Sequence, residues 1–391
     1  MERVVQPYQL SRPTHRAAVH VVYVARGGAG LHPVLRSAVS VMRWSATPAR
    51  LCFHVLCGET CLRDLAKPKD PSTIQGLRET ELNVKYYNAT DGGLWAQLSD
   101  LGRLWLHYTA LHPRIPIRLK NHMFTVPKLF LHELLQVPRA LVLDTDTQVM
   151  ACICTLWDEL ADQLQAQPSA VLAYAHEQQG IYRDGMRRAL QLIGAANRSS
   201  SLLAGYNGGV GLQALERMRT QHAYRTLLHN ATLLATHDPA RIGTHLTPDG
   251  SHQGDQSIFT WMSSVQPVLW KTLALTINCE WNFQLCLHWY ATRGFGVGEH
   301  NTRNGMCRRA PKLLHANCPD TLKTALMQLD LSDRSPAALM RNLRTLDDAW
   351  RTPELAQQCA TVQERLPGAD VLATVCNANF LLQRYAAMVR V

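Results

Sequence analysis

Short apolar runs alternate along the chain with stretches in which apolar residues recur at helical spacing. The first apolar run is rich in β-branched residues, and the runs predict strands at residues 17–25, 50–57, 83–88, 141–143, 170–175 and 312–315. Helical spacing predicts helices over residues 31–43, 120–135, 155–165 and 215–234. Because strands and helices alternate, the pattern predicts an α/β fold with a mostly parallel central sheet flanked by helices.

The two ends of the chain depart from this alternation. Residues 1–16 combine Pro, Gln and basic residues without periodicity, which predicts a loose N-terminal arm. Residues 17–325 are expected to form the α/β domain, and residues 326–391 a helical C-terminal extension without recognisable chemistry. No apolar stretch of about 18 residues is present, so no membrane span is expected in this chain. Residues 1–20 also lack the apolar core of a signal peptide.

The apolar strand at residues 141–143 ends abruptly in Asp144, Thr145 and Asp146. In open α/β sheets ligands bind outside the carboxyl ends of the strands, so the two carboxylates are placed to meet a ligand. With one residue between them, they could bind one hard divalent cation whose remaining ligands are phosphate oxygens. A solvated exit from a strand has the same pattern, so the triplet alone leaves both interpretations open.

A glycine-rich turn follows the first predicted strand. Ala25 is followed by Arg26, Gly27 and Gly28, and glycines at this point let the backbone approach a ligand closely. The spacing does not match the G-x-G-x-x-G fingerprint, so a nicotinamide cofactor is not indicated, although a nucleotide fits. A tight strand-to-helix turn would use the same glycines.

Amides and aromatic rings gather in the second half of the chain. Asn207, in the segment GYNGGVGL, suits a sugar hydroxyl, and its glycines leave room for a sugar ring; an Asn-Gly turn is the plain alternative. Asp255 opens a predicted helix, either as a cap or as a binding residue. Residues 278–289, NCEWNFQLCLHW, combine Trp, Asn and Gln as carbohydrate-binding surfaces do. His176 and Glu177 end another predicted strand and are expected to point toward the same crevice.

The charge of the chain favours anionic partners. A formal net charge of +10 and a pI near 9.2 suit nucleotides and acidic glycans. The arginines are scattered and form no long basic run, so a nucleic-acid-binding surface is the weaker interpretation. Lys128 and His315 indicate nothing by themselves, because a lysine in a helix is usually solvated and a single histidine at a strand end is usually structural.

Eleven cysteines are many for a cytosolic protein of this length. They form no CxxC pair and show no Cys/His spacing of a zinc site, so disulfides are preferred to metal binding. Cys152 and Cys154 are instead expected to be small buried hydrophobic residues. Three glycosylation sequons, at Asn88, Asn197 and Asn230, agree with the lumen of the secretory pathway.

In their order along the chain, these motifs resemble glycosyltransferase family 8 over residues 19–323. Five segments of the chain most resemble the branch of xyloside alpha-1,3-xylosyltransferases: AHEQQGIYRDGMRRAL, GYNGGVGLQALERMR, GDQSIF, CEWNFQLC and LLHANC. The related xylosyl- and glucuronyltransferases of dystroglycan share the D-x-D, Y-N-x-G-V, D-Q-x-I-F and W-N-x-Q-L pieces. The resemblance implies a Rossmann-like GT-A catalytic domain that transfers a sugar from a UDP-sugar, with UDP-xylose preferred, to a glycan acceptor on a protein, such as an EGF-like repeat.

The resemblance also implies a role for each motif residue. Asp144, Asp146 and His315 would bind Mn²⁺, which suits a mixed set of oxygen and nitrogen ligands. The UDP-sugar would contact Ala25, Arg26, Gly27, Lys128, Thr145, Asn207, Gly208, Asp255 and Gln256. The acceptor would contact Trp281, Gln284 and Asn317. Gln256 would lie near the anomeric carbon, so the implied catalytic residues are Asp144, Asp146 and Gln256.

Members of family 8 retain the anomeric configuration. No carboxylate is an obvious nucleophile on the far face of the sugar, which favours front-face attack by the acceptor hydroxyl. A bound metal would stabilise the negative charge that grows on the β-phosphate of the leaving UDP.

The segment around His315 departs from the family pattern and contains cysteines that are expected to pair. Residues 315–318, HANC, stand where family members often carry His-x-x-Gly-x-x-Lys, and Lys323 is the candidate replacement for the missing phosphate-binding lysine. The spacing of the branch implies that Cys279 and Cys286 pair with Cys307 and Cys318.

Other functions fit part of the same sequence. A family 8 transferase could use glucose, galactose or glucuronate instead of xylose. A non-catalytic sugar-binding pseudoenzyme would keep the fold but would have little reason to keep Asp144, Asp146 and His315 together. The sequence does not indicate an oligomeric state.

Overall fold

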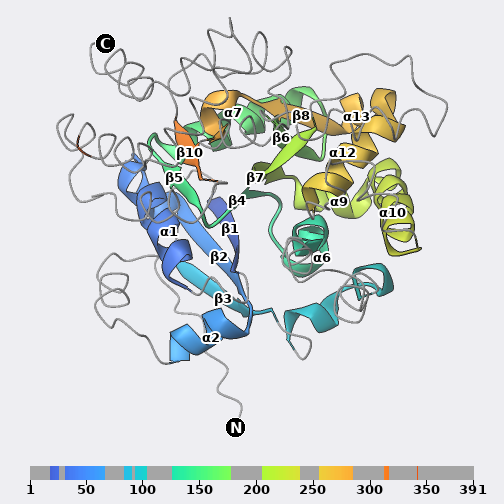
Figure 1. Ribbon diagram of the computed structural model, residues 1–391. Coiled ribbons are helices and arrows are strands. Elements are labelled where there is room, and N and C mark those ends of the chain that lie inside the picture. The colour runs from blue at the N-terminus through green and yellow to red at the C-terminus, as the bar shows by residue number, and fades with distance from the viewer. Residues whose placement is uncertain are drawn as a thin grey trace, which may run out of the picture.

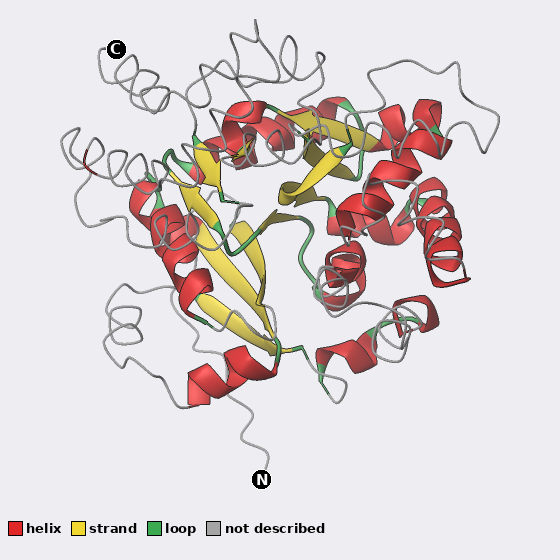
Figure 2. Cartoon of the chain, viewed as in Figure 1, coloured by secondary structure: helices red, strands yellow, loops and turns green. Residues whose placement is uncertain are grey.

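Two β-sheets surrounded by helices make up the described part of the chain (Figure 1; Figure 2). The computed structural model describes residues 18–25, 31–66, 83–89, 93–103, 126–177, 205–237, 255–284, 312–316 and 341. The predicted N-terminal arm lies outside these residues, as does the predicted C-terminal extension apart from Arg341. Among the described helices, none combines the length and the apolar character needed to cross a bilayer.

The larger sheet has seven strands in the order β3-β2-β1-β4-β7-β6-β8. These strands are β3 (Val84–Asn88), β2 (Leu51–Cys57), β1 (Val19–Ala25), β4 (Ala140–Leu143), β7 (Tyr206–Gln213), β6 (Leu172–His176) and β8 (Ala274–Ile277). Strand β7 runs antiparallel to both of its neighbours, and the other pairs are parallel. The sheet is therefore mostly parallel, and the fold class predicted from the sequence is confirmed.

Burial on both faces explains the apolar runs of the central strands. Strands β2 and β4 are buried along their whole length, with the sequences LCFHVLC and ALVL. A strand covered on both sides by helices needs apolar residues at consecutive positions, so the two-residue alternation of a half-exposed strand is absent.

Helices cover both faces of the large sheet and give the molecule two hydrophobic cores. On one face, α1 (His32–Trp44) and α7 (Ile153–Ala166) pack against side chains such as Tyr23 and Phe53. On the other face, α9 (Leu215–Thr220), α10 (His222–His237), α12 (Asp255–Val265) and α13 (Pro267–Leu273) pack against Val22, Val142 and Tyr174. Figure 1 shows α1 beside β1 and β2, well away from the group of α9, α10 and α12.

A second, three-stranded sheet joins segments that are far apart in the sequence. Its order is β5-β10-β9, with β5 (Thr147–Val149), β10 (Leu313–His315) and β9 (Phe283–Gln284). Strand β10 runs antiparallel to β5, with His315 opposite Thr147, and parallel to β9, with His315 opposite Gln284. Because β5 follows β4 after three residues and pairs with β10, this sheet brings β10 to the end of β4 (Figure 1).

Two predicted helices take a different form. The helix expected over residues 120–135 is, in its described part, the 3₁₀ helix η3 (Val126–Phe130) followed by the single turn α6 (Leu131–Leu134). Pro127 has no backbone N–H and is tolerated only in a first helical turn, so a continuous helix through it is disfavoured. The helix expected over 215–234 is divided into α9 and α10 at Gln221, whose ψ of 101° is extended.

The described residues also form several shorter elements. They are η1 (Pro48–Arg50), α2 (Glu59–Ala66), η2 (Leu94–Gln97) and η6 (Cys279–Trp281). Cys57 and Cys61 form a disulfide between the end of β2 and α2. Cys279 is also disulfide-bonded, and the other cysteines predicted to pair around it lie outside the described residues. Cys154 is buried as predicted, whereas Cys152 is half-buried.

Candidate active site

Asp144, Thr145 and Asp146 form the turn between β4 and β5. The backbone N–H of Asp144 donates to the carbonyl of Gly209 at 2.8 Å, and the N–H of Ala316 donates to the carbonyl of Asp146 at 2.9 Å. The turn is thus held by β7 on one side and by the end of β10 on the other. The two carboxylate side chains are 30% and 20% exposed, so a ligand can reach both.

His315 joins these two carboxylates in one group. Its Nε2 lies 3.6 Å from an oxygen of Asp144 and 3.4 Å from an oxygen of Asp146, and the side chain is 3% exposed. The three ligand atoms lie within 4.8 Å of one another. The structure therefore brings together the three residues that the sequence predicted as metal ligands.

Asn282 fixes the orientation of the His315 ring. The Nδ1 of His315 lies 3.1 Å from the side-chain oxygen of Asn282, which can only accept a hydrogen bond. Nδ1 therefore donates to Asn282, and Nε2, which faces the two carboxylates, is the ring nitrogen that a metal ion could use. Metal-binding histidines are commonly held in this way, and a set of two carboxylates and one imidazole fits Mn²⁺ or a similar divalent ion.

A chain of amides fixes Asn282 in turn. Its Nδ2 donates to the Oδ1 of Asn207 at 2.8 Å, and the N–H of Gly209 donates to the same Oδ1 at 2.9 Å. The Nδ2 of Asn207 donates to the Oε2 of Glu177 at 3.0 Å. Because a carboxylate only accepts, Glu177 sets the direction of every hydrogen bond from itself to His315.

Glu177 also orients the predicted catalytic amide. The Nε2 of Gln256 donates to the Oε2 of Glu177 at 2.7 Å, and the Oε1 of Gln256 accepts from the N–H of Gly208 at 3.1 Å. Glu177 is 2% exposed. One buried carboxylate therefore anchors both Asn207 and Gln256, the two amides predicted to contact the donor sugar.

Lys128 is a buried cation at the centre of this group, with an exposed fraction of 2%. Its ammonium donates to Oδ1 of Asp144 and to the carbonyl of Gly208, and it lies 3.9 Å from Oδ2 of Asp255. Burial lowers the pKa of Lys128, but the nearby carboxylates, led by Asp144, outweigh it and raise the pKa to about 12. Oδ1 of Asp144 is thus engaged by Lys128, while Oδ2 faces His315.

Two glycines of β7 make room for charged side chains. A Cβ at Gly208 would lie 2.9 Å from Oδ2 of Asp255, and a Cβ at Gly209 would lie 2.1 Å from Cε1 of His315. The sequence suggested that these glycines leave room for a sugar ring. In the structure, the side chain of Asp255 occupies the space beside the Cα of Gly208, and the side chain of His315 occupies the space beside the Cα of Gly209.

The remaining predicted site residues have other surroundings. Ala25 is buried at the end of β1, while Arg26, Gly27, Asn317 and Lys323 lie outside the described residues. Trp281 and Gln284, predicted to contact the acceptor, are 1% and 2% exposed, and the ammonium of Lys312 lies 4.9 Å from the Trp281 ring centre. Their role at the acceptor stays a prediction.

Glu177, Asn282 and Gly209 were not assigned a role from the sequence. Glu177 was expected only to point toward the crevice, and Asn282 stands inside the aromatic and amide-rich segment that was noted. Their importance depends on partners from distant parts of the chain, which no local pattern reveals.

Comparisons with known proteins show similarity to a xylosyltransferase. No family model matches the chain. Xyloside xylosyltransferase 1 of Mus musculus is 30% identical over 186 residues, which are 47% of this chain and 43% of that protein. The same protein of Homo sapiens is 30% identical over 189 residues, 48% of this chain and 43% of that protein. The chain thus spans less than half the length of these curated relatives.

A solved structure extends the similarity to the fold. The crystal structure of mouse xyloside xylosyltransferase 1 in its apo form matches 78% of this chain and 99% of its own chain, with a TM-score of 0.52 and 23% sequence identity. This likeness confirms the predicted GT-A fold. The sequence similarity to xyloside xylosyltransferase 1 agrees with the branch that the motifs indicated.

Proposed function

We propose that this homologue of xyloside xylosyltransferase 1 is a metal-dependent, retaining glycosyltransferase that transfers xylose from UDP-xylose to a glycan on a protein. The observation that carries the proposal is the group of Asp144, Asp146 and His315, in which Asn282 orients the ring so that Nε2 faces the carboxylates. A sugar-binding protein without catalysis would have no use for a histidine held in this way.

Mn²⁺ is the metal of the proposal, held by Asp144, Asp146 and His315. Two oxygen ligands and one nitrogen ligand suit it better than Mg²⁺, which prefers oxygen alone. When bound, the ion supplies a Lewis acid for the diphosphate of the donor. The exposure of both carboxylates supports this assignment, because the diphosphate must reach the ion from the solvent side.

The residues around the metal ligands would position the donor sugar. Lys128 holds one oxygen of Asp144, so the other stays directed toward His315. Glu177 orients the amides of Asn207 and Gln256, whose dipoles are then fixed before any sugar arrives. Such preorganisation lowers the cost of stabilising a charge that develops during the reaction.

Front-face attack by the acceptor hydroxyl is part of the proposal. A double displacement would need a carboxylate free to attack the sugar. Glu177 accepts hydrogen bonds from both Asn207 and Gln256 on the same oxygen, which suits an anchor rather than a nucleophile.

The proposed place of action is the lumen of the endoplasmic reticulum or Golgi. The disulfide of Cys57 and Cys61, and the disulfide-bonded state of Cys279, suit an oxidising compartment. The sequon residues Asn88 and Asn230 are exposed, as glycosylation requires. The proposed acceptor is a glucose-xylose glycan on an EGF-like repeat.

A panel of UDP-sugars tests this function. The purified protein is incubated with Mn²⁺, each UDP-sugar and a xylosyl-glucoside acceptor, and released UDP is measured. UDP-xylose should react fastest, and chelation of the metal or Asp146→Asn should reduce turnover to background. Asp100→Asn, on an exposed residue that pairs with Arg103, is the matched control and should keep full activity. Turnover without a metal, or equal turnover of Asp146→Asn, would remove the metal role, and preference for UDP-glucose, UDP-galactose or UDP-glucuronate would change the donor.

A further inference from the structure

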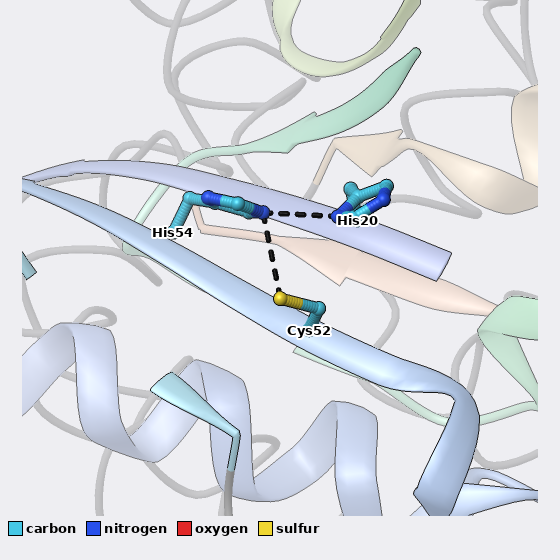
Figure 3. Close-up of side chains that lie close together, drawn as sticks. All are labelled: His20, Cys52 and His54. Atoms are coloured by element: carbon cyan, nitrogen blue, oxygen red, sulfur yellow. Dashed lines mark hydrogen bonds between the residues drawn. The ribbon is translucent and has the colours of Figure 1, made fainter. Parts of the chain in front are cut away.

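A second group of potential metal ligands lies on the large sheet, on strands β1 and β2 (Figure 3). His20 is the second residue of β1, and Cys52 and His54 belong to β2. His20 pairs in register with Cys52, and two residues further His54 pairs with Val22, so all three side chains lie on one face of the sheet. His20 and Cys52 are the second residues of parallel strands and His54 is the middle residue of β2, whereas Asp144 follows the carboxyl end of β4. The group is therefore distinct from the candidate active site.

The distances within this group resemble those between ligands of one ion. The Nε2 of His54 lies 3.0 Å from the Nδ1 of His20 and 3.6 Å from the Sγ of Cys52. In a tetrahedral zinc site, bonds of about 2.0 Å to nitrogen and about 2.3 Å to sulfur separate two nitrogens by roughly 3.3 Å and nitrogen from sulfur by roughly 3.5 Å. The sulfur stands close to that separation from His54, the two ring nitrogens are a few tenths of an ångström closer than in such a site, and all three ligand atoms lie within 4.8 Å of one another.

Hydrogen bonding alone accounts poorly for the position of His54. Its Nε2 carries either one proton or one lone pair, yet both His20 and Cys52 approach that single atom, as the dashed lines of Figure 3 show. Only one of these two contacts can be a full hydrogen bond. A cation between the three atoms would engage all of them at once.

The surroundings of His54 also suit a ligand. Its Nδ1 lies 2.8 Å from the hydroxyl of Tyr87, which can accept the ring proton and leave the lone pair on Nε2. Ring stacking between His54 and Tyr87 holds the imidazole in this orientation. A hydrogen bond of this kind to the far nitrogen is typical of metal-binding histidines.

The electrostatics of the group favour a soft ion. Burial, with Lys85 and Arg139 nearby, lowers the pKa of His20 to about 4, and burial, with His20 and Lys85, lowers the pKa of His54 to about 3. Burial and the nearby cations therefore disfavour the charged form of each ring, and the neutral imidazole is the form that binds a metal. The two cations disfavour a hard ion held by charge alone, whereas a thiolate ligand offsets part of an ion's charge and forms a strong bond to a soft metal.

We propose that His20, Cys52 and His54 bind a zinc ion, with the fourth position left for water or another ligand. The ion would tie β1 to β2 near the start of both strands, and this role is independent of sugar transfer. No zinc motif is visible in the sequence, because His20 comes from a different strand and only the Cys-x-His spacing of β2 is local.

Cobalt loading tests the proposal. The metal-stripped full chain is titrated with Co²⁺, and the charge-transfer absorption from thiolate to cobalt is recorded. We expect one such band at one ion per chain, with Cys52→Ala abolishing it and Cys152→Ala, on another free cysteine, leaving it unchanged. The ions at Asp144, Asp146 and His315 give no such band, because that group has no sulfur.

Zinc analysis in the Asp146→Asn background gives a second readout. One tightly held zinc should remain in that variant. His20→Asn should weaken zinc binding at least about 100-fold, and Tyr87→Phe roughly 10-fold, since the loss of a hydrogen bond to a ligand costs about that much. Circular dichroism of each variant verifies that it is folded. A band that persists in Cys52→Ala, or a folded chain that holds no stoichiometric zinc and shows no band, would overturn the proposal.

Discussion

The backbone of Gly209 lies against the imidazole of His315, so closely that a Cβ on Gly209 would stand 2.1 Å from Cε1 of the ring. The ring is 3% exposed, and its Nδ1 faces Asn282 at 3.1 Å. Strand β7 and Asn282 together therefore fix the direction in which Nε2 faces. Strand β7 is therefore part of the large sheet and also fixes the position of the His315 ring.

Gly209→Ala should displace His315 and weaken metal binding. The added methyl group cannot be accommodated without a shift of the ring, and overpacking of this kind costs about 1–3 kcal/mol. We expect the affinity for Mn²⁺ in the presence of UDP, measured by calorimetry, to fall at least about 10-fold. Wild-type affinity in a folded Gly209→Ala variant would contradict the role of this contact.

Glu177→Gln should reduce activity although the side chain keeps its size. The Oε2 of Glu177 accepts hydrogen bonds from Asn207 and Gln256. In the Gln variant, either an NH₂ donor faces these two donors, or a neutral carbonyl oxygen accepts weaker hydrogen bonds from them. Each hydrogen bond to a charged group contributes about 1.5–3 kcal/mol, so kcat/KM should fall roughly 10- to 100-fold. Glu216→Gln, on the exposed side of α9, is the matched control and should behave as wild type. Equal kinetics of the two variants would mean that Glu177 orients neither amide.

Lys128→Met should destabilise the fold, and Asp255→Asn should restore part of the loss. Removal of the buried ammonium leaves the carboxylate of Asp255, 3% exposed, without its cation at 3.9 Å. Breaking a buried ion pair by removing one partner costs about 3–5 kcal/mol, which urea denaturation can measure. The double variant should be more stable than Lys128→Met alone. Additive losses in the double-mutant cycle would show that the two residues do not interact.

His132 should make the protein less stable in mild acid. Burial, with Arg219 and Arg225 nearby, lowers the pKa of His132 from 6.5 to about 4. The unfolded chain then binds a proton near pH 6.5 that the folded chain accepts only near pH 4, so this contribution is complete above pH 6.5 and is lost as the pH falls toward 4. Between pH 7 and 4.5 the loss is about 2 kcal/mol.

His132→Phe isolates this effect from that of other buried histidines. A phenyl ring suits the site, because the imidazole already packs against Phe130 and Tyr224. The free energy of unfolding of the variant should fall by about 2 kcal/mol less than that of wild type over the same pH range. An unchanged slope would place the acid sensitivity at other groups.

The sequence by itself determined the first strands of the large sheet, helices α1 and α7, and the kind of chemistry at the end of β4. The run at 141–143 and the triplet Asp144-Thr145-Asp146 are local, because the two-residue and 3.6-residue periods reflect which side of one element is buried. The resemblance of ordered motifs then led to Asn207, Gln256 and His315 as parts of one site, and the structure confirms their proximity.

Tertiary structure alone decided how these residues are oriented and which of them depend on one another. The register of β10 between β5 and β9 sets His315 beside the turn after β4, and the antiparallel course of β7 places Gly209 beneath it. The same is true of His20 beside Cys52, which lie on neighbouring strands. Such contacts depend on strand order and register, which arise from the packing of the whole sheet and leave no trace in a local pattern.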